Sequence, residues 1–246
     1  MATQDIRTET VSYSGGGRTL KGYLAWDAAQ PGPRPGIALF GEWWGLNDYL
    51  KRRAREVAAL GYVALAADMY GDGRLAADST EAGQLMSGLF ADMAATSDRV
   101  RAAIDTLAHK ASVDKSRLGA MGYCLGGALS LHAARLGLPL KGVASFHGSL
   151  GKTHPAKPGD VKASVLVCHG ADDKFISADE LAGFKDEMRE LRVDLKFVSY
   201  PGAIHGFTNP EATRNGEKFG LPLRYDAATD QQSWNEMVAF WKRVFA

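Results

Sequence analysis

The segment Gly122-Tyr123-Cys124-Leu125-Gly126-Gly127 places a nucleophilic side chain between two glycines. Glycines two residues before and two residues after the cysteine give the nucleophile-elbow pattern, with cysteine in the usual serine position. The turn in this pattern is tight, and a Cβ at those positions would collide with neighbouring backbone. An apolar strand pattern precedes the segment and a helical pattern follows it. The start of a helix favours a thiolate, so Cys124 is the candidate nucleophile.

A thiol nucleophile needs a base, and the fold order places an acid before a histidine. His169-Gly170-Ala171-Asp172-Asp173 ends an apolar stretch, and we prefer Asp173 as the acid, with Asp172 as the alternative. His205 lies in a glycine-flanked loop after the next apolar stretch. Aspartates also favour turns, and a lone loop histidine is usually solvated. The ordered set of cysteine, aspartate and histidine therefore predicts a catalytic triad.

A fourth group follows the first apolar strand, in Gly41-Glu42-Trp43-Trp44-Gly45. A carboxylate beside two tryptophans at a strand end is costly without a partner, so Glu42 is a candidate site residue; the alternative is a surface acid beside core tryptophans. An oxyanion hole needs two backbone N–H donors, and we expect them from Leu125 and Trp43. Five side chains near these groups are candidates for contacting substrate: Trp44, Tyr123, His147, Phe207 and Asn209.

The elements that must hold these residues alternate between strands and helices. Strands are expected at Thr8–Tyr13, Thr19–Trp26, Gly36–Phe40, Tyr62–Ala67, Arg117–Gly122, Gly142–Phe146, Val165–His169 and Leu195–Tyr200. Helices are expected after Asn47 and at about residues 79–94, 97–109, 126–136, 178–191 and 227–245. The first two strands flank Gly15-Gly16-Gly17 and form a hairpin. Ser177 and Glu180 form a capping box.

This alternation predicts an α/β protein with a mostly parallel central sheet, covered by helices on both faces, after an N-terminal antiparallel hairpin. We expect residues 1–246 to form a single domain. In such a sheet the active site lies at the carboxyl ends of the strands, which is where the candidate residues fall.

Composition excludes several function classes. The net charge of +1 gives no field that would collect nucleic acid. Two cysteines are too few for a disulfide framework, and no apolar run reaches the roughly 20 residues that span a bilayer. The N-terminus lacks a secretory signal, so we expect a cytoplasmic protein. No nucleotide or zinc motif occurs. The expected partner is a small molecule, with neither nucleic acid nor membrane, and the expected state is a monomer or a small homo-oligomer.

Together, the loop at Glu42, the elbow at Cys124, the acid turn and Ile204-His205-Gly206-Phe207 resemble the dienelactone hydrolase family of α/β-hydrolases. The resemblance runs from about Pro35 to the end of the chain. It implies a hydrolase of lactones and related esters that uses no cofactor. It also implies Cys124 as nucleophile with Asp173 and His205 as partners, and Glu42 as a carboxylate that holds the resting thiol neutral and then takes its proton.

The sequence departs from this family at one position. The best-known members place a carboxylate-binding arginine four residues after the catalytic histidine, where this chain has Asn209. This difference predicts a preference for neutral esters or lactones over dienelactone, unless another cation serves: Arg74, Lys174, Arg214 or Arg224. Two other function classes remain as alternatives, a thiol redox protein built on Cys124 and a non-catalytic binding protein with the same fold.

Overall fold

The computed structural model describes residues 4–246. Residues 1–3, the start of the stretch read for a secretory signal, lie outside the described part. The chain divides into two compact units, Met1–Met121 and Gly122–Ala246. Each unit combines strands with helices, as the alternating pattern predicts.

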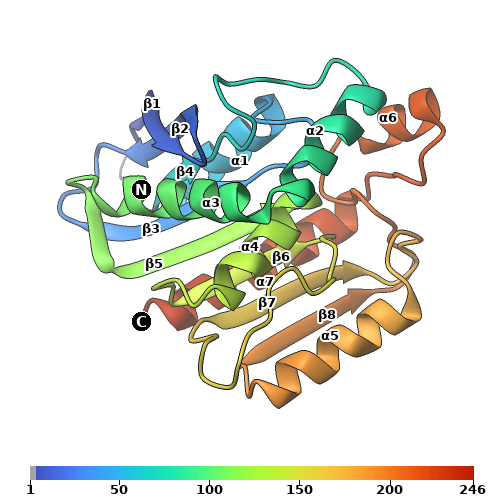
Figure 1. Ribbon diagram of the computed structural model, residues 1–246. Coiled ribbons are helices and arrows are strands. Elements are labelled where there is room, and N and C mark those ends of the chain that lie inside the picture. Colours follow the sequence, from blue (N-terminus) through green and yellow to red (C-terminus); the bar gives the residue numbers. More distant parts are fainter. Residues whose placement is uncertain (1–3) are drawn as a thin grey trace. The chain divides into compact units, whose positions relative to one another are not determined.

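The first unit carries strands in the order β1-β2-β4-β3-β5. β3 and β4 are parallel, whereas β1 pairs with β2, and β2 with β4, in antiparallel fashion. Every residue of β3 is buried, which explains the apolar run Gly36–Phe40 that follows Arg34 and Pro35. Helix α1 packs on β2 and β4, and α3 packs on β1 and β3 (Figure 1). The elements are β1 (Ile6–Gly15), β2 (Arg18–Asp27), β3 (Arg34–Phe40), α1 (Asp48–Ala59), β4 (Val63–Ala66), α2 (Ser79–Ala91), α3 (Met93–Ala108) and β5 (Val113–Tyr123), whose last two residues belong to the second unit.

The predicted N-terminal hairpin is confirmed, with a tighter turn than expected. β1 extends through Gly15, so the turn is Gly16-Gly17, with φ values of 53° and 70°. Glycine adopts such values at no steric cost, and a Cβ on Gly16 would lie 2.4 Å from the Ala95 carbonyl oxygen. The glycines therefore serve both the turn and the close approach of α3.

The second unit carries parallel strands in the order β6-β7-β8. Helix α4 packs on β6, and α7 packs on β6 and β7. Helix α5 lies beside β8 (Figure 1). The Lys185 ammonium group of α5 lies over the Phe197 ring of β8. The elements are α4 (Leu125–Arg135), β6 (Gly142–Phe146), β7 (Ser164–Gly170), α5 (Ala178–Glu190), β8 (Leu195–Tyr200), α6 (Ala212–Phe219) and α7 (Ala227–Val244).

The predicted caps at Asn47 and Ser177 are confirmed. Asn47 caps α1, because its Oδ1 accepts the Leu50 N–H at 3.1 Å. Ser177 likewise accepts the Glu180 N–H at 3.1 Å. The Glu180 carboxylate also accepts the Leu150 N–H at 2.7 Å. A loop distant in sequence supplies a donor to the carboxylate that local spacing assigned to the helix terminus.

One helix escaped the sequence analysis. α6 is eight residues long, includes Gly216 and ends at Gly220 in the left-handed conformation, φ 65°. A short polar segment with an internal glycine gives a weak helical signal. Between residues 4 and 246, no helix is both long and apolar enough to cross a membrane.

Candidate active site

The backbone at Cys124 has the geometry of a nucleophile elbow. Cys124 has φ 54° and ψ −119°, a strained combination for a residue with a side chain. Its N–H donates to the Phe146 carbonyl oxygen at 3.0 Å, which ties the turn to the end of β6. Helix α4 starts at the next residue, Leu125, whose N–H precedes the helical ladder. Cys124 is partly exposed, as a nucleophile must be.

The glycines of the elbow are required by close contacts. A Cβ on Gly122 would lie 2.1 Å from the Gly126 carbonyl oxygen. A Cβ on Gly127 would lie 2.6 Å from the Ser145 hydroxyl and 2.9 Å from Cα of Gly148. The first contact explains the tight turn that the sequence pattern predicts. The second shows that the start of α4 also needs a small residue against the loop after β6.

The acid turn and the histidine loop are held together by backbone contacts. The Asp172 N–H donates to the Ala203 carbonyl at 3.0 Å, and the Ala171 N–H donates to the Tyr200 carbonyl at 3.0 Å. A Cβ on Gly170 would lie 2.7 Å from the Ala203 oxygen, so only glycine permits this approach. The ends of β7 and β8 thereby bring their following loops side by side.

Of the two adjacent aspartates, Asp173 is the one that bonds to the histidine. Its Oδ2 lies 2.8 Å from His205 Nδ1, and its Oδ1 accepts the Phe175 N–H at 2.9 Å. The Asp173 side chain is fully buried and the His205 side chain is 10% exposed. Asp172 is exposed. The structure thus brings Asp173 and His205 together and leaves Asp172 in solvent.

His205 also forms a hydrogen bond with the Cys124 thiol, which completes a chain from carboxylate to imidazole to sulfur. Burial would lower the pKa of His205, but the negative charge of Cys124 and the hydrogen bond to Asp173 outweigh it and raise the pKa to about 10. The raised pKa favours the imidazolium form of His205 when Cys124 is ionised. The arrangement can therefore stabilise a thiolate and deliver a proton to a leaving group.

The remaining catalytic candidates lie in the first unit, in the loop between β3 and α1. Glu42 is 7% exposed, and its carbonyl accepts the Gly45 N–H at 3.2 Å. The Trp43 and Trp44 rings meet edge to face, with centroids 5.2 Å apart, and both side chains are half-buried. Tyr70 fixes the loop, because its hydroxyl donates to the Trp43 carbonyl at 2.9 Å.

Four of the five substrate-contact candidates are buried in the structure. Tyr123, His147, Phe207 and Asn209 are each 3% exposed or less. The His147 ring lies 5.1 Å from both the His205 ring and the Phe207 ring, so His147 packs between them. The Asn209 Oδ1 accepts the Glu211 N–H at 3.0 Å, in the turn before α6. Among these candidates, only Trp44 retains partial exposure.

The structure adds Phe175, which the sequence analysis missed. Its ring is 49% exposed, and its centroid lies 4.9 Å from that of His205 in an edge-to-face arrangement. The available signal was an apolar residue two positions after Asp173, in an otherwise polar turn. An exposed aromatic ring against His205 is a suitable wall for an apolar substrate group.

The sequence offers four cations that could bind a substrate carboxylate in place of the arginine missing at position 209. Three of them already have partners within the protein. Arg74 pairs with Glu81 at 2.6 Å, Arg214 pairs with Glu211, and Arg224 donates to the Gly202 carbonyl at 2.7 Å. Across residues 4–246, no group of three or more histidine, cysteine or acidic side chains is placed to hold a metal ion.

Comparisons with known proteins give the family and the fold of this chain. The model of the dienelactone hydrolase family matches residues 20–245. The solved structure m3DLH is 40% identical, with a TM-score of 0.93, and the match covers 98% of this chain and 99% of that one. The dienelactone hydrolase-like promiscuous phosphotriesterase P91 from metagenomic libraries is 38% identical, with a TM-score of 0.90 over 98% of this chain and 99% of that one. A putative carboxymethylenebutenolidase of Aquifex aeolicus is 25% identical, over 95% of this chain and 97% of its own length.

The family match and the structural likeness both extend over nearly the whole chain, and they confirm the predicted fold. The chain belongs to the dienelactone hydrolase family of α/β-hydrolases.

Proposed function

We propose that this protein hydrolyses lactones and carboxylic esters through a thioester on Cys124. The observation that carries the proposal is the chain of hydrogen bonds from Asp173 through His205 to the Cys124 thiol. The elbow presents the sulfur on a strained, partly exposed turn, and the raised pKa of His205 provides a proton donor beside it.

In the first half-reaction, the Cys124 thiolate attacks the carbonyl carbon and forms a C–S bond. The carbonyl π electrons move to oxygen, and we infer that the Leu125 and Trp43 N–H groups stabilise this oxyanion. When the tetrahedral intermediate collapses, the C–O bond breaks and His205 gives its proton to the leaving oxygen. In a lactone, the freed hydroxyl stays on the acyl group.

In the second half-reaction, water attacks the thioester while His205 accepts its proton. The C–S bond breaks, the electron pair returns to sulfur, and the carboxylic acid product ionises. Asp173 holds the Nδ1–H of the imidazole, so the other nitrogen faces the sulfur throughout. We infer that Glu42 opposes formation of the Cys124 thiolate until substrate binds. We also infer that residues 1–246 work as a single catalytic domain.

The test is a burst assay with an activated neutral ester such as p-nitrophenyl acetate. An acyl-enzyme mechanism predicts rapid release of about one equivalent of nitrophenolate before the steady state. Cys124→Ala should abolish both the burst and the turnover. Cys168→Ala is the matched control, because Cys168 is fully buried and burial raises the pKa of its thiol to about 12. Near-normal turnover in Cys124→Ala would disprove the proposal.

The same assay separates the two alternative functions. Reversible oxidation of Cys124 by peroxide, without any hydrolysis, would indicate a redox protein. A binding protein would show neither reaction. The burial of Cys168 argues against a redox pair, because a reactive thiol needs exposure and an accessible thiolate.

A second candidate activity, hydrolysis of phosphotriesters, rests on the 38% identity with P91. The thiolate would attack phosphorus, expel an aryloxide and form a phosphorylated sulfur that water then cleaves. Release of p-nitrophenolate from paraoxon, lost in Cys124→Ala, would support it. Absence of release at enzyme concentrations that turn over p-nitrophenyl acetate would exclude it.

A further inference from the structure

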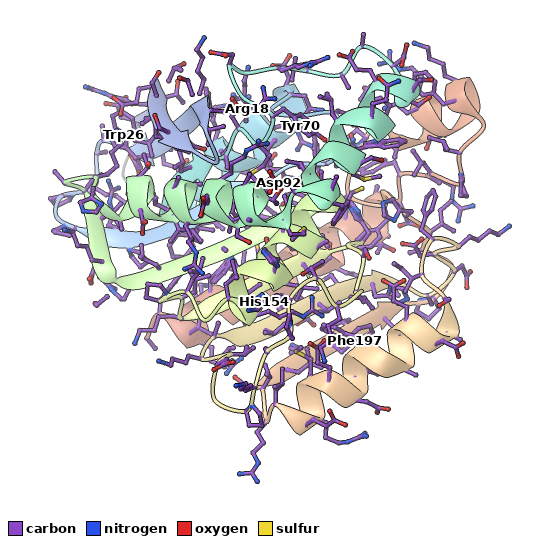
Figure 2. All side chains as sticks on the ribbon, viewed as in Figure 1. Arg18, Trp26, Tyr70, Asp92, His154 and Phe197 are labelled. Carbon is purple, nitrogen blue, oxygen red and sulfur yellow. The ribbon has the colours of Figure 1, made fainter. Side chains whose placement is uncertain are left out.

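The first unit contains a cavity that the hydrolytic reaction does not use. Its volume is about 150 Å³. It lies among the start of β2, the loop after β4, and helices α2 and α3; Figure 2 shows Arg18 and Tyr70 near each other in this region. The lining residues are Arg18, Tyr70, Arg74, Gln84, Leu85, Gly88, Leu89 and Arg99. Three of these eight are arginines and none is acidic.

The arginines are only partly neutralised. Within residues 4–246, the exposed side chain of Arg18 makes no hydrogen bond or ion pair, although its backbone pairs with Gly15. Arg99 is half-buried. Among the described residues, its side chain makes one hydrogen bond, from Nη1 to the Met69 carbonyl at 2.9 Å. The buried Nε of Arg99 has no partner among the described residues. Arg74 alone has a carboxylate partner, Glu81.

The nearby acids are already engaged elsewhere. Asp68 accepts four backbone N–H groups, from residues 21, 70, 71 and 73. Asp92 caps α3 by accepting the Ala95 N–H at 2.9 Å. Burial and the charge of Arg18 lower the pKa of Arg99, while Asp92 and Asp68 partly offset this effect. Like charges therefore face each other across the cavity, and a bound anion would relieve their repulsion.

We propose that this cavity binds a compact oxyanion, a phosphate group or a short dicarboxylate. Guanidinium groups recognise phosphate and carboxylate oxygens through paired, charge-assisted hydrogen bonds. A volume of about 150 Å³ is enough to admit such an anion. Gln84 adds a neutral hydrogen-bond donor to the lining.

The cavity is connected to the loop that carries Glu42 and Trp43. Tyr70 lines the cavity and donates its hydroxyl to the Trp43 carbonyl at 2.9 Å. Beyond Arg74, Leu75 forms an isolated β-bridge with Gly45, and the Ala76 N–H donates to the Trp44 carbonyl at 3.1 Å. An anion that orders Tyr70 and Arg74 would therefore also act on the conformation of residues 43–45.

Binding is tested with inorganic phosphate and malonate as probes, by calorimetric titration and by thermal melting, with potassium chloride holding the ionic strength constant. A ligand that binds the folded state raises Tm in a saturable way. Arg18→Gln should weaken binding tenfold or more, since a charged hydrogen-bond partner is lost. Arg101→Gln, an exposed arginine on α3 outside the cavity, should bind like the wild type. The stronger of the two probes identifies the anion class.

Two results would overturn the proposal. One is the absence of saturable binding by either probe beyond the effect of chloride. The other is an equal response in Arg18→Gln and Arg101→Gln, which would mean only non-specific charge screening. The link to the loop is tested by tryptophan emission. In the wild type the emission should change in proportion to the fraction of protein with bound anion. In Trp43→Phe or Tyr70→Phe this change should be absent. Saturable binding with unchanged emission would refute the link. None of these measurements depends on the proposed hydrolysis.

Discussion

The Oδ2 atom of Asp173 lies 2.8 Å from Nδ1 of His205, with both side chains almost completely removed from solvent. The contact is made possible by the glycine at position 170, where a side chain would strike the Ala203 carbonyl. A buried carboxylate that fixes the imidazole leaves the other ring nitrogen for the Cys124 thiol. This relationship gives each of the two adjacent aspartates a different expected role.

Asp173→Asn should lower kcat/KM for a neutral ester by roughly 10²-fold or more, because an amide does not hold the correct imidazole tautomer or stabilise its charge. Asp172→Asn removes the same charge one residue away, from an exposed position, and should leave kcat/KM nearly unchanged. Steady-state kinetics of both variants decide the assignment. Comparable losses in the two would mean that the overall charge of the turn matters more than the hydrogen bond.

Replacement of Glu42 should make the resting thiol more reactive. In the proposed mechanism the buried Glu42 carboxylate disfavours the Cys124 thiolate and so slows alkylation, whereas the His205 imidazolium favours it. Glu42→Gln keeps the shape of the side chain and removes the charge, so the rate of Cys124 alkylation by iodoacetamide should rise. A lowered or unchanged alkylation rate, together with unaffected hydrolysis, would leave Glu42 without a role.

The stability contributed by His205 should fall as the pH rises. Its pKa is raised from 6.5 to about 10, so the folded state binds the proton more tightly than the unfolded state. The contribution is complete below pH 6.5 and is lost as the pH rises through about 10. Urea unfolding of wild type and His205→Gln at pH 6, 8 and 10 should show a shrinking difference in free energy. A difference that grows with pH would indicate a neutral resting imidazole.

The sequence analysis succeeded where local pattern and tertiary structure agree. Residues 36–40 of β3 are a continuous apolar run because both faces of the strand are buried, and the glycine at 122 follows from the tight turn at Cys124. Contacts between segments that are far apart in sequence could not be predicted. The Leu150 N–H that donates to Glu180 lies 30 residues away in sequence, and the burial of Tyr123, which stacks on Phe146, leaves no local trace. The exposure of Phe175 is likewise set by packing.

A buried ion pair gives a stability prediction in the second unit. Arg135 donates to both carboxylate oxygens of Glu187, at 3.2 and 2.8 Å, and to the carbonyls of Leu150 and Gly151. Arg135→Ala would leave a buried carboxylate and two carbonyls without their partner, which should lower the free energy of unfolding by about 3–5 kcal/mol. Arg189→Ala removes an exposed pair with Asp186 and should cost at most about 1 kcal/mol. Equal losses in urea denaturation would contradict this account.

The preference between neutral and anionic substrates should depend on Phe175, because position 209 holds an asparagine and no cation. The Asn209 amide oxygen accepts the Glu211 N–H and so holds the turn before α6, and asparagine carries no charge to attract a carboxylate. The exposed Phe175 ring, in contact with His205, offers apolar surface to a neutral acyl or alcohol group.

We therefore expect kcat/KM to be higher for neutral esters and lactones than for dienelactone. Phe175→Ala should lower kcat/KM for a neutral hydrophobic ester by about tenfold, since burying an aromatic ring against substrate contributes on the order of 1.5 kcal/mol or more. The loss should be smaller for an acetyl ester, which covers less of the ring. Phe90→Ala, another partly exposed phenylalanine, on α2, serves as the control. A loss in Phe175→Ala that is the same for short and long esters would show that Phe175 positions His205 and does not contact substrate.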